Sequence, residues 1–394
     1  MTGRIPRAED FPLGAATTLA DLEEDPHPRL ALLRVREPVS WVPALGGWLV
    51  TSHDLALEVM RDAGRFTVDD PRFSTAQVVG PSMLSLDGPE HERHRRPFGA
   101  PFRPLALRER FAALVAADAD RLIDAFAGDS GTAELRSAFA GPLATLTIAR
   151  ALGLAPGEVA DLLGWYEAIV ASVTEITGGG PVSARGARAF AQLRARLQEV
   201  IADREHSSLL RDAATSWPLS PEEIVSNAGV LLFGGIETTE GMILNALSRL
   251  LADRKWIAAA AEPASLGLCV EESLRLEPAA TMVDRYATTE VRLGPALISA
   301  GELVHVSISG ANRDPRVFPD PDRFDPARGN VRRHLAFAHG PHVCLGVHLA
   351  RLEATVGVGV LLRRLADLRL ASTAPPAARG LVFRKPAELL VNWG

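Results

Sequence analysis

Residues 337–346 read FAHGPHVCLG, a segment in which Cys344 lies between glycines, follows a histidine and precedes an apolar run. A free cysteine is most often a small buried hydrophobe, but a thiolate is also a metal ligand. Gly340 and Gly346 allow a sharp turn and a close approach of the backbone to a flat group. The predicted helix 347–365 places Cys344 at a helix N-terminus, where the dipole and free amides favour a thiolate. The segment alone leaves both interpretations open.

Composition narrows the class of protein. The chain has 394 residues, of which 47% are apolar and 23% charged, with a net charge of −6. An acidic total without long basic runs argues against a nucleic-acid binder. No apolar run approaches the roughly 20 residues that span a bilayer, and residues 1–14 lack the apolar core of a signal peptide. With Cys269 as the only other cysteine, left as a core residue, a disulfide framework is excluded. We expect a cytoplasmic protein without membrane insertion.

The hydrophobic pattern is mainly helical. Periodic apolar residues, caps and terminal glycines predict helices over 52–64 and 108–128, and one very long helix over 218–254. Residues 40–51 predict a hairpin around 45–47, and residues 380–393 predict another. The proline-rich stretch 312–330 is irregular, and such long loops are usually functional. The fold class is therefore mainly α with small β-sheets, in a single domain over 1–394.

The centre of the long helix reads GGIETT, from Gly234 to Thr239. Each glycine costs a helix about 1 kcal/mol relative to alanine, so a reason for the pair is expected. Either a ligand lies against the helix there, or another helix crosses closely. Thr238 can donate back to an earlier carbonyl and distort the local ladder.

Two further motifs are weak when taken singly. Glu272 and Arg275 lie three apart on one helical face and can pair, as many solvated surface residues do. His91 and Arg95 lie four apart on another predicted helix and could hold an anion, or simply form an exposed polar turn.

Taken together and in this order, these motifs resemble the cytochrome P450 family, specifically its soluble bacterial branch. The family's cysteine-loop pattern is Phe-x-x-Gly-x-His-x-Cys-x-Gly. Every fixed position of that pattern is present here, as Phe337, Gly340, His342, Cys344 and Gly346. The resemblance implies the cytochrome P450 fold and haem b as cofactor, with Cys344 as the iron ligand and metal-binding residue.

The same resemblance implies further roles. The residues expected to hold the haem propionates are His91, Arg95, Arg285 and His342. Phe337 and Gly346, in the cysteine loop, are also expected to contact the cofactor, with Phe337 shielding the sulfur from water. Glu272, Arg275 and Arg323 match a structural charge network that pins the segment 312–330 behind that loop.

On the other side of the haem, Glu237 and Thr238 resemble the acid–alcohol pair that relays protons for oxygen activation, and Gly234 and Gly235 are expected to make room for O2. The implied activity is monooxygenation of a small, largely apolar organic substrate, which includes natural-product tailoring in many bacterial relatives. Two other activities are alternatives. A peroxide-driven haem-thiolate enzyme would replace the acid–alcohol pair, and a catalytically silent haem-binding recruitment module would lose the cysteine or the relay. Neither loss is seen.

The remaining expectations concern substrate and partners. Residues expected to line the substrate pocket are Val230, Phe233, Gly234, Thr281, Val283, Val382 and Phe383, with 72–85 and 171–186 as covers. No electron-transfer domain is fused, so a ferredoxin and a ferredoxin reductase are the implied electron donors to a monomer. Arg93, Arg96, Arg332 and Arg333 form either a basic docking face or scattered surface charges.

Overall fold

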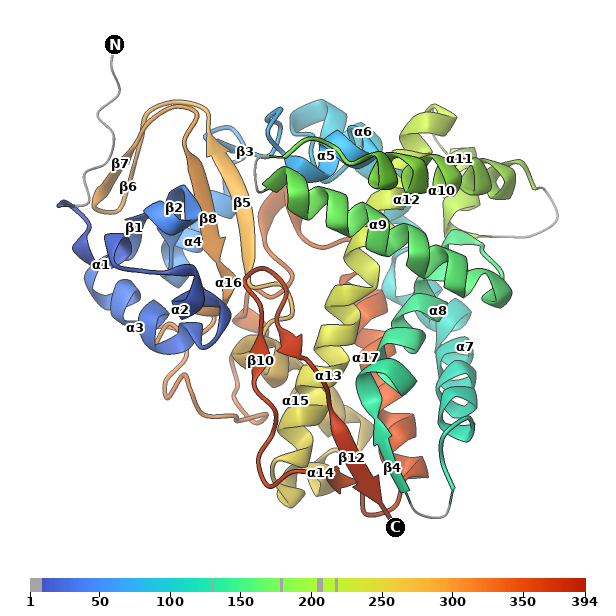
Figure 1. The fold of residues 1–394 in the computed structure, drawn as a ribbon. Coiled ribbons are helices and arrows are strands. Elements are labelled where there is room, and N and C mark those ends of the chain that lie inside the picture. The colour runs from blue at the N-terminus through green and yellow to red at the C-terminus, as the bar shows by residue number, and fades with distance from the viewer. Residues whose placement is uncertain (1–8, 129–130, 178–179, 204–207, 217–218) are drawn as a thin grey trace.

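In the computed structural model, which describes residues 9–128, 131–177, 180–203, 208–216 and 219–394, the chain forms a mostly helical body with four small sheets (Figure 1). The predicted fold class is confirmed. The α-helices are α1 (Pro12–Ala15), α2 (Leu19–Glu23), α3 (Pro26–Arg36), α4 (His53–Arg61), α5 (Ser74–Val79), α6 (Gly88–Gly99), α7 (Pro104–Asp124), α8 (Gly141–Leu152), α9 (Val159–Thr177), α10 (Ala184–Ala202), α11 (Leu209–Ser216), α12 (Pro221–Gly235), α13 (Glu237–Leu251), α14 (Arg254–Ala259), α15 (Pro263–Leu276), α16 (Ile308–Ala311) and α17 (Val347–Arg364).

Short 3-10 turns lie between several of the helices and strands. They are η1 (Pro43–Leu45), η3 (Pro156–Glu158), η4 (Val331–Arg333) and η5 (Gly340–His342), and η2 (Arg136–Ala140) is a π-helical turn. The strands are β1 (Val39–Val42), β2 (Gly47–Val50), β3 (Phe66–Thr67), β4 (Gly131–Glu134), β5 (Met282–Ala287), β6 (Val291–Leu293), β7 (Ala296–Ile298), β8 (Leu303–Ser307), β9 (Arg369–Leu370), β10 (Ala378–Arg379), β11 (Lys385–Pro386) and β12 (Leu390–Trp393).

The N-terminal part of the chain and residues 282–307 share the largest sheet, whose strand order is β1-β2-β8-β5-β3. The predicted hairpin at 40–51 is confirmed, because β1 and β2 pair antiparallel from Val42–Gly47 to Val39–Val50. Gly46 closes the turn at φ +62°, a left-handed conformation that favours glycine. A separate apolar core, including Trp48, Phe66 and Val304, packs against this sheet.

Helices α7, α8, α12, α13, α15 and α17 build the main hydrophobic core, which also takes in buried Cys269. Figure 1 shows α13 and α17 running side by side through the middle of the molecule. The predicted helices at 52–64 and 108–128 appear as α4 and α7. By length and composition, residues 221–251 could cross a bilayer. However, 61% of their most apolar window is buried inside the fold, as in the core helix of a soluble protein.

The prediction of one long helix over 218–254 is wrong in one respect: the helix is interrupted at a single residue. Helix α12 ends at Gly235 and α13 begins at Glu237, and Ile236 between them lies at the edge of the right-handed helical region, at φ −84° and ψ −70°. The hydroxyl of Thr238 donates to the carbonyl of Gly234 across this break, as the sequence suggested it could. The two glycines and the back-bonded threonine together weaken the helical ladder at this point.

The predicted C-terminal hairpin over 380–393 is also wrong in part. Strand β11 pairs with β10, whereas β12 joins a different sheet between β4 and β9. Pro386 has no N–H, so the β10–β11 ladder cannot be extended through it. The chain therefore changes sheets between Pro386 and Leu390.

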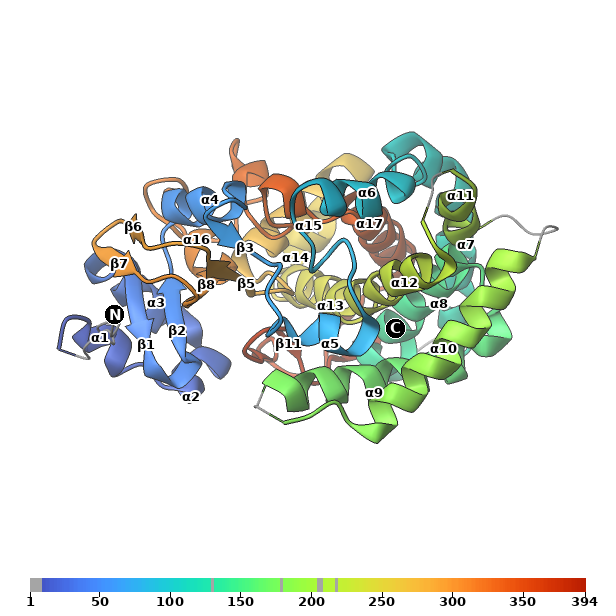
Figure 2. The same cartoon turned by 90° about the horizontal axis from the view of Figure 1, so that it is seen from above.

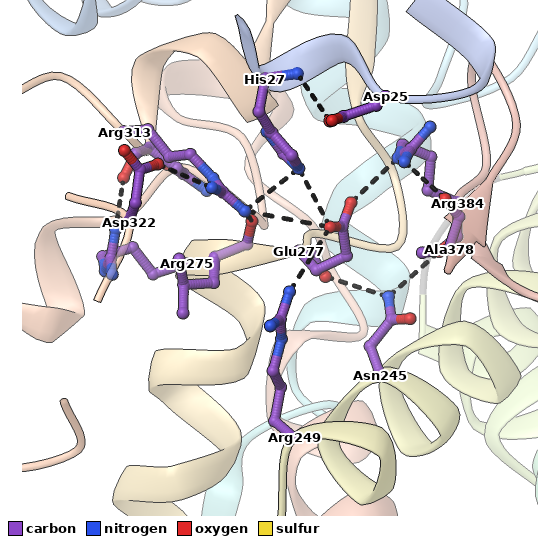
Figure 3. A network of polar contacts seen from close by, with 12 residues as sticks. Asp25, His27, Asn245, Arg249, Arg275, Glu277, Arg313, Asp322, Ala378 and Arg384 are labelled. Atoms are coloured by element: carbon purple, nitrogen blue, oxygen red, sulfur yellow. Dashed lines mark hydrogen bonds and ion pairs between the residues drawn. The ribbon is translucent and has the colours of Figure 1, made fainter. Parts of the chain in front are cut away.

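A buried charge network ties the ends of the chain to the helical core (Figure 3). The carboxylate of Glu277, just after α15, lies 3.1 Å from Nε2 of His27 and 2.9 Å from Nε of Arg384. Arg249 and Arg313 lie within 4.0 Å of the same carboxylate. These four partners come from α3, α13, the segment after α16 and the hairpin β10–β11, so the carboxylate of Glu277 links four parts of the fold to the end of α15.

Burial opposes ionisation of Glu277. However, the hydrogen bond from His27 and the charges of His27, Arg384 and Arg313 outweigh it and hold the pKa of the carboxyl down at about 2. A lowered pKa means that the carboxylate contributes stability above the unfolded pKa of about 4.3, and that this contribution is lost as the pH falls toward 2.

We predict that Glu277→Gln lowers the free energy of unfolding by about 3 kcal/mol at pH 7, the value that corresponds to the lowered pKa. Denaturant unfolding at several pH values measures it. The difference from the wild type should stay constant between pH 7 and 5 and narrow below pH ~4.3. Glu290→Gln, at an exposed glutamate, serves as the control and should change stability by less than ~0.5 kcal/mol. A loss that persists undiminished into acid would contradict this account.

Candidate active site

The cysteine loop is held by one close backbone approach. Gly340 lies at φ +75°, and a Cβ at this position would meet the carbonyl oxygen of Met60, in α4, at 2.3 Å. No other residue fits there without moving the backbone. Cys344 N–H donates to the carbonyl of Phe337 at 2.9 Å, which closes the loop. Gly346 then forms the N-cap of α17, so Cys344 lies two residues before that cap.

The thiol of Cys344 has an unusual environment. The residue is exposed by surface area, yet burial raises the pKa of its thiol, against the hydrogen bond from Gly346 N–H and the charges of Arg95 and Arg351. Cations and a backbone amide near the sulfur favour the thiolate once a metal binds it.

Two histidines lie beside each other near this loop. The rings of His91, in α6, and His342, in η5, have centroids 4.3 Å apart. Nε2 of His342 lies 2.7 Å from Asp87, which also accepts from Thr67 and the N–H of Val68. Burial opposes ionisation of Asp87, but these hydrogen bonds hold the pKa of its carboxyl well below the usual range.

Within the described residues, Nε2 of His91 and Nδ1 of His342 are buried without a hydrogen-bond partner. Burial and the nearby charges of His342 and Arg95 lower the pKa of His91 to about 4, so its imidazole is neutral at pH 7. Buried polar atoms are normally satisfied. The two orphaned nitrogens therefore indicate a ligand with hydrogen-bonding groups.

The predicted arginines belong to the same region. Arg95 donates to the carbonyl of Val343 in the cysteine loop. Arg285, in β5, is buried and donates to the carbonyl of Asp284, and burial lowers the pKa of its guanidinium against the charges of Asp87 and Asp284. Sequence reasoning missed Asp87, since its position before Gly88 resembles an ordinary helix cap.

The helix break carries the other half of the candidate site. Gly234 is exposed, and a Cβ there would meet nothing within 4 Å, so open space borders the helix at this point. Gly235 instead packs on Ile148 of α8. The close helix packing expected as one alternative is therefore found at Gly235, and the open space at Gly234 leaves room for a ligand, the other alternative. The carboxylate of Glu237 accepts a hydrogen bond of 2.9 Å from the hydroxyl of Tyr166 in α9.

A third group reaches Glu237 from the C-terminal hairpin. Nζ of Lys385 lies 3.4 Å from Glu237 and 3.0 Å from Glu240, whose carboxylate also binds Arg136. Sequence reasoning identified Glu237 and missed Lys385, Glu240 and Tyr166. The scarcity of lysine, with only Lys255 and Lys385 in the chain, was the one available signal for Lys385.

Several of the predicted pocket residues lie together. The rings of Phe233 and Phe383 meet edge to face at 5.9 Å. Val230 and Val283 are half-buried, and Val382 is 43% exposed. The hydroxyl of Thr281 donates to the carbonyl of Leu381, so it fixes the hairpin against β5.

The two predicted covers pack on each other at one face of the molecule. Helix α5, from the stretch 72–85, contacts α9, which ends inside the stretch 171–186 (Figure 2). Residues 178–179 of the second cover lie outside the described residues. Of the four arginines considered for docking, Arg93 is bound by Glu90 and Glu223, so its charge is already balanced.

The charge network behind the loop differs from the expected one in its third member. Arg275 pairs with Glu272 through two hydrogen bonds, and both side chains are fully buried. The guanidinium of Arg323 is not the third member, because that side chain is exposed and only its carbonyl accepts from Arg275. Arg328 takes the place instead, with Nε 3.4 Å from Glu272. The register of the irregular segment 312–330, which sequence spacing does not fix, decides which arginine turns inward.

Comparison with known proteins agrees with this geometry. The family model described as "Cytochrome P450" matches residues 266–386. The chain is similar to nocardicin C N-oxygenase of Nocardia uniformis, with 34% identity covering 97% of this chain and 98% of the relative. It is also similar to cytochrome P450 107B1 of Saccharopolyspora erythraea, with 33% identity over 89% and 90%. Among solved structures, a cytochrome P450 of Chondromyces apiculatus superimposes with a TM-score of 0.83, at 28% identity and 97% coverage of both chains.

We predict that Arg328→Ala destabilises the protein by about 3 kcal/mol, because it removes a guanidinium that binds Glu272 and the carbonyls of Pro319 and Asp320. Arg323→Ala is the matched control and should change the free energy of unfolding by no more than ~0.5 kcal/mol. Denaturant unfolding of the two variants measures the difference. Equal losses in both would show that Arg323 belongs to the network after all.

Proposed function

The chain belongs to the cytochrome P450 family and is a cytochrome P450 monooxygenase, and from this premise we propose how its own residues divide the work. Cys344 supplies the thiolate that binds haem iron. His91, Arg95, Arg285 and His342 receive the haem propionates. Glu237 and Thr238 deliver protons on the opposite side.

The residues of the site fit a haem group. Two propionates need cationic or hydrogen-bonding partners when they are buried. The unpartnered imidazole nitrogen of His91 and the buried guanidinium of Arg285 are donors of that kind. Haem bound through a thiolate supplies the redox chemistry that cleaves the O–O bond. We propose that this cofactor is haem b. The main supporting observation is that Nε2 of His91 and Nδ1 of His342, beside the cysteine loop, are buried without a hydrogen-bond partner among the described residues.

The reaction consumes two protons and two electrons for each O2: one oxygen atom enters the substrate and the other leaves as water. Glu237 and Thr238 are the first two residues after the helix break, close to the open space at Gly234. A carboxylate that exchanges protons with solvent and a hydroxyl that passes them on form a relay of the required type. Thr238 holds its hydroxyl at the break through its bond to Gly234, and turning that hydroxyl toward the open space would extend the relay.

The substrate that we propose is a small, largely apolar organic molecule. Phe233 and Phe383 offer aromatic walls, with Val230, Thr281, Val283 and Val382 around them, and such linings favour apolar ligands. Similar proteins include mycinamicin IV hydroxylase/epoxidase of Micromonospora griseorubida and pentalenic acid synthase of Streptomyces avermitilis. We therefore propose natural-product tailoring as the setting.

Electrons are proposed to come from separate proteins, a ferredoxin and a ferredoxin reductase. Residues 1–394 act as a single domain and a monomer in this proposal, in the cytoplasm. With Cys344 assigned to the haem iron, residues 1–394 contain only one further cysteine, too few for an iron–sulfur cluster, and this supports separate donors.

The thiolate assignment predicts a spectroscopic result. Reduced protein under carbon monoxide should show the red-shifted absorption band of thiolate ligation, and Cys344→Ser should abolish that band. Cys269→Ser is the control and should keep it, since Cys269 is buried in the core. A histidine-type spectrum in the wild type, or an unchanged band in Cys344→Ser, would refute the assignment.

The relay assignment predicts uncoupling. In Thr238→Ala, electrons are still accepted but protons arrive out of step, so we expect peroxide to rise and product per electron pair to fall by about tenfold or more. Product, peroxide and reductant consumption are measured together. Thr239→Ser, at the buried neighbouring threonine, is the control. Unchanged coupling in Thr238→Ala would remove Thr238 from the relay.

A further inference from the structure

Both oxygens of the Glu237 carboxylate are engaged by groups from outside its own helix. Oε2 accepts the hydroxyl of Tyr166 at 2.9 Å, and Oε1 lies 3.4 Å from Nζ of Lys385. Burial and the charge of Glu237 raise the pKa of Tyr166 far above its ordinary value, so its hydroxyl remains a donor. The orientation of the carboxylate is therefore set by α9 on one side and by the C-terminal hairpin on the other.

Lys385 is itself held in place. Its ammonium lies 3.0 Å from Glu240, and Glu240 accepts from Nε of Arg136 at 2.6 Å. The side chains of Lys385 and Glu240 are 10% and 9% exposed, whereas that of Arg136 is 43% exposed. Arg136, Glu240, Lys385 and Glu237 thus form a chain of alternating positive and negative charges from the surface inward. Ion pairs among the buried members of this chain are screened less than they would be in water.

The hairpin that carries Lys385 is anchored from its other face. Successive side chains of an extended strand point to opposite sides. Arg384 points to Glu277, as Figure 3 shows, and also donates to the carbonyls of Glu23 and Ala378. Phe383 and Lys385 consequently both face the α12–α13 helices, where they meet Phe233 and Glu237.

We propose that Lys385 is a positioning residue for proton delivery, whose ammonium orients the Glu237 carboxylate at the start of the relay. The inference rests on the proposed role of Glu237. Lys385 does not touch substrate or O2 and acts only through Glu237. Removing its charge leaves Glu237 with the Tyr166 hydroxyl alone, so protons reach Thr238 more slowly while the substrate pocket is unchanged.

The kinetic test compares Lys385→Met with Lys255→Met in the holoenzyme. Lys255 pairs with Asp253 at the surface and serves as the control. In Lys385→Met we expect kcat to fall about tenfold, which is less than loss of a proton donor itself would cost, with KM within twofold. The solvent isotope effect on kcat should increase, and Lys385→Arg should restore much of the rate because it retains the charge. An unchanged isotope effect, or no rescue by arginine, would overturn the proposal.

A second measurement does not depend on turnover. Because the chain has only two lysines, ¹³Cε-lysine labelling of the diamagnetic reduced carbon monoxide complex gives two lysine signals, which Lys255→Arg assigns. Glu237→Gln should move the Lys385 signal and leave the Lys255 signal in place. If neither signal moves, Lys385 does not contact Glu237 and the proposal fails.

The outcomes separate this inference from the proposed function. A missing thiolate band in the wild type would refute the haem-thiolate site itself. In a second outcome, the wild type shows the thiolate band, Glu237→Gln uncouples electron use from product formation, and Lys385→Met remains fully coupled. That outcome would refute only the assignment of Lys385.

Discussion

The guanidinium of Arg275 lies fully buried and donates to both oxygens of Glu272 and to the carbonyls of Asn312, Pro321 and Arg323. Through these bonds a regular helix, α15, fixes an irregular segment that could not hold its own shape. Glu272 completes the arrangement by accepting from the N–H of Asp325 and from Arg328. A buried charge left without one of its partners is costly, so the segment has one favoured conformation. The cysteine loop follows this segment in the chain, so the contacts that fix the segment also fix where the loop begins.

The second constraint is the break at Ile236. An unbroken helix would satisfy every carbonyl along its length, but here Thr238 takes the carbonyl of Gly234. Just before the break, Gly235 packs on Ile148, whereas a Cβ at Gly234 would meet nothing within 4 Å. It also turns Glu237 toward Tyr166 and Lys385. The cost in helical stability is offset by the surrounding core, to which both α12 and α13 contribute.

Charged groups from distant parts of the sequence converge at two places, on Glu277 and around Glu237. Both clusters include a residue of the C-terminal hairpin, because Arg384 pairs with Glu277 and Lys385 pairs with Glu237. The hairpin therefore links the stability of the fold to the geometry of the candidate relay. Each strand in it is only two residues long, so side-chain contacts rather than its ladder hold it in place.

The sequence by itself determined the helical class, the hairpin at 40–51, the cysteine loop and the helix N-terminus after it, because those features depend on local spacing, glycine and capping. It also marked Glu237, Thr238, Glu272 and Arg275 through motifs within single helices. Only the tertiary structure decided that Arg328 rather than Arg323 binds Glu272, that β12 leaves its expected partner for β4 and β9, and that Asp87, Tyr166 and Lys385 complete the site. Arg328 and Glu272 are 56 positions apart and the pairs between β12 and β4 are 256 to 262 positions apart, and the pairing of such distant groups depends on how helices pack. No local pattern encodes that packing.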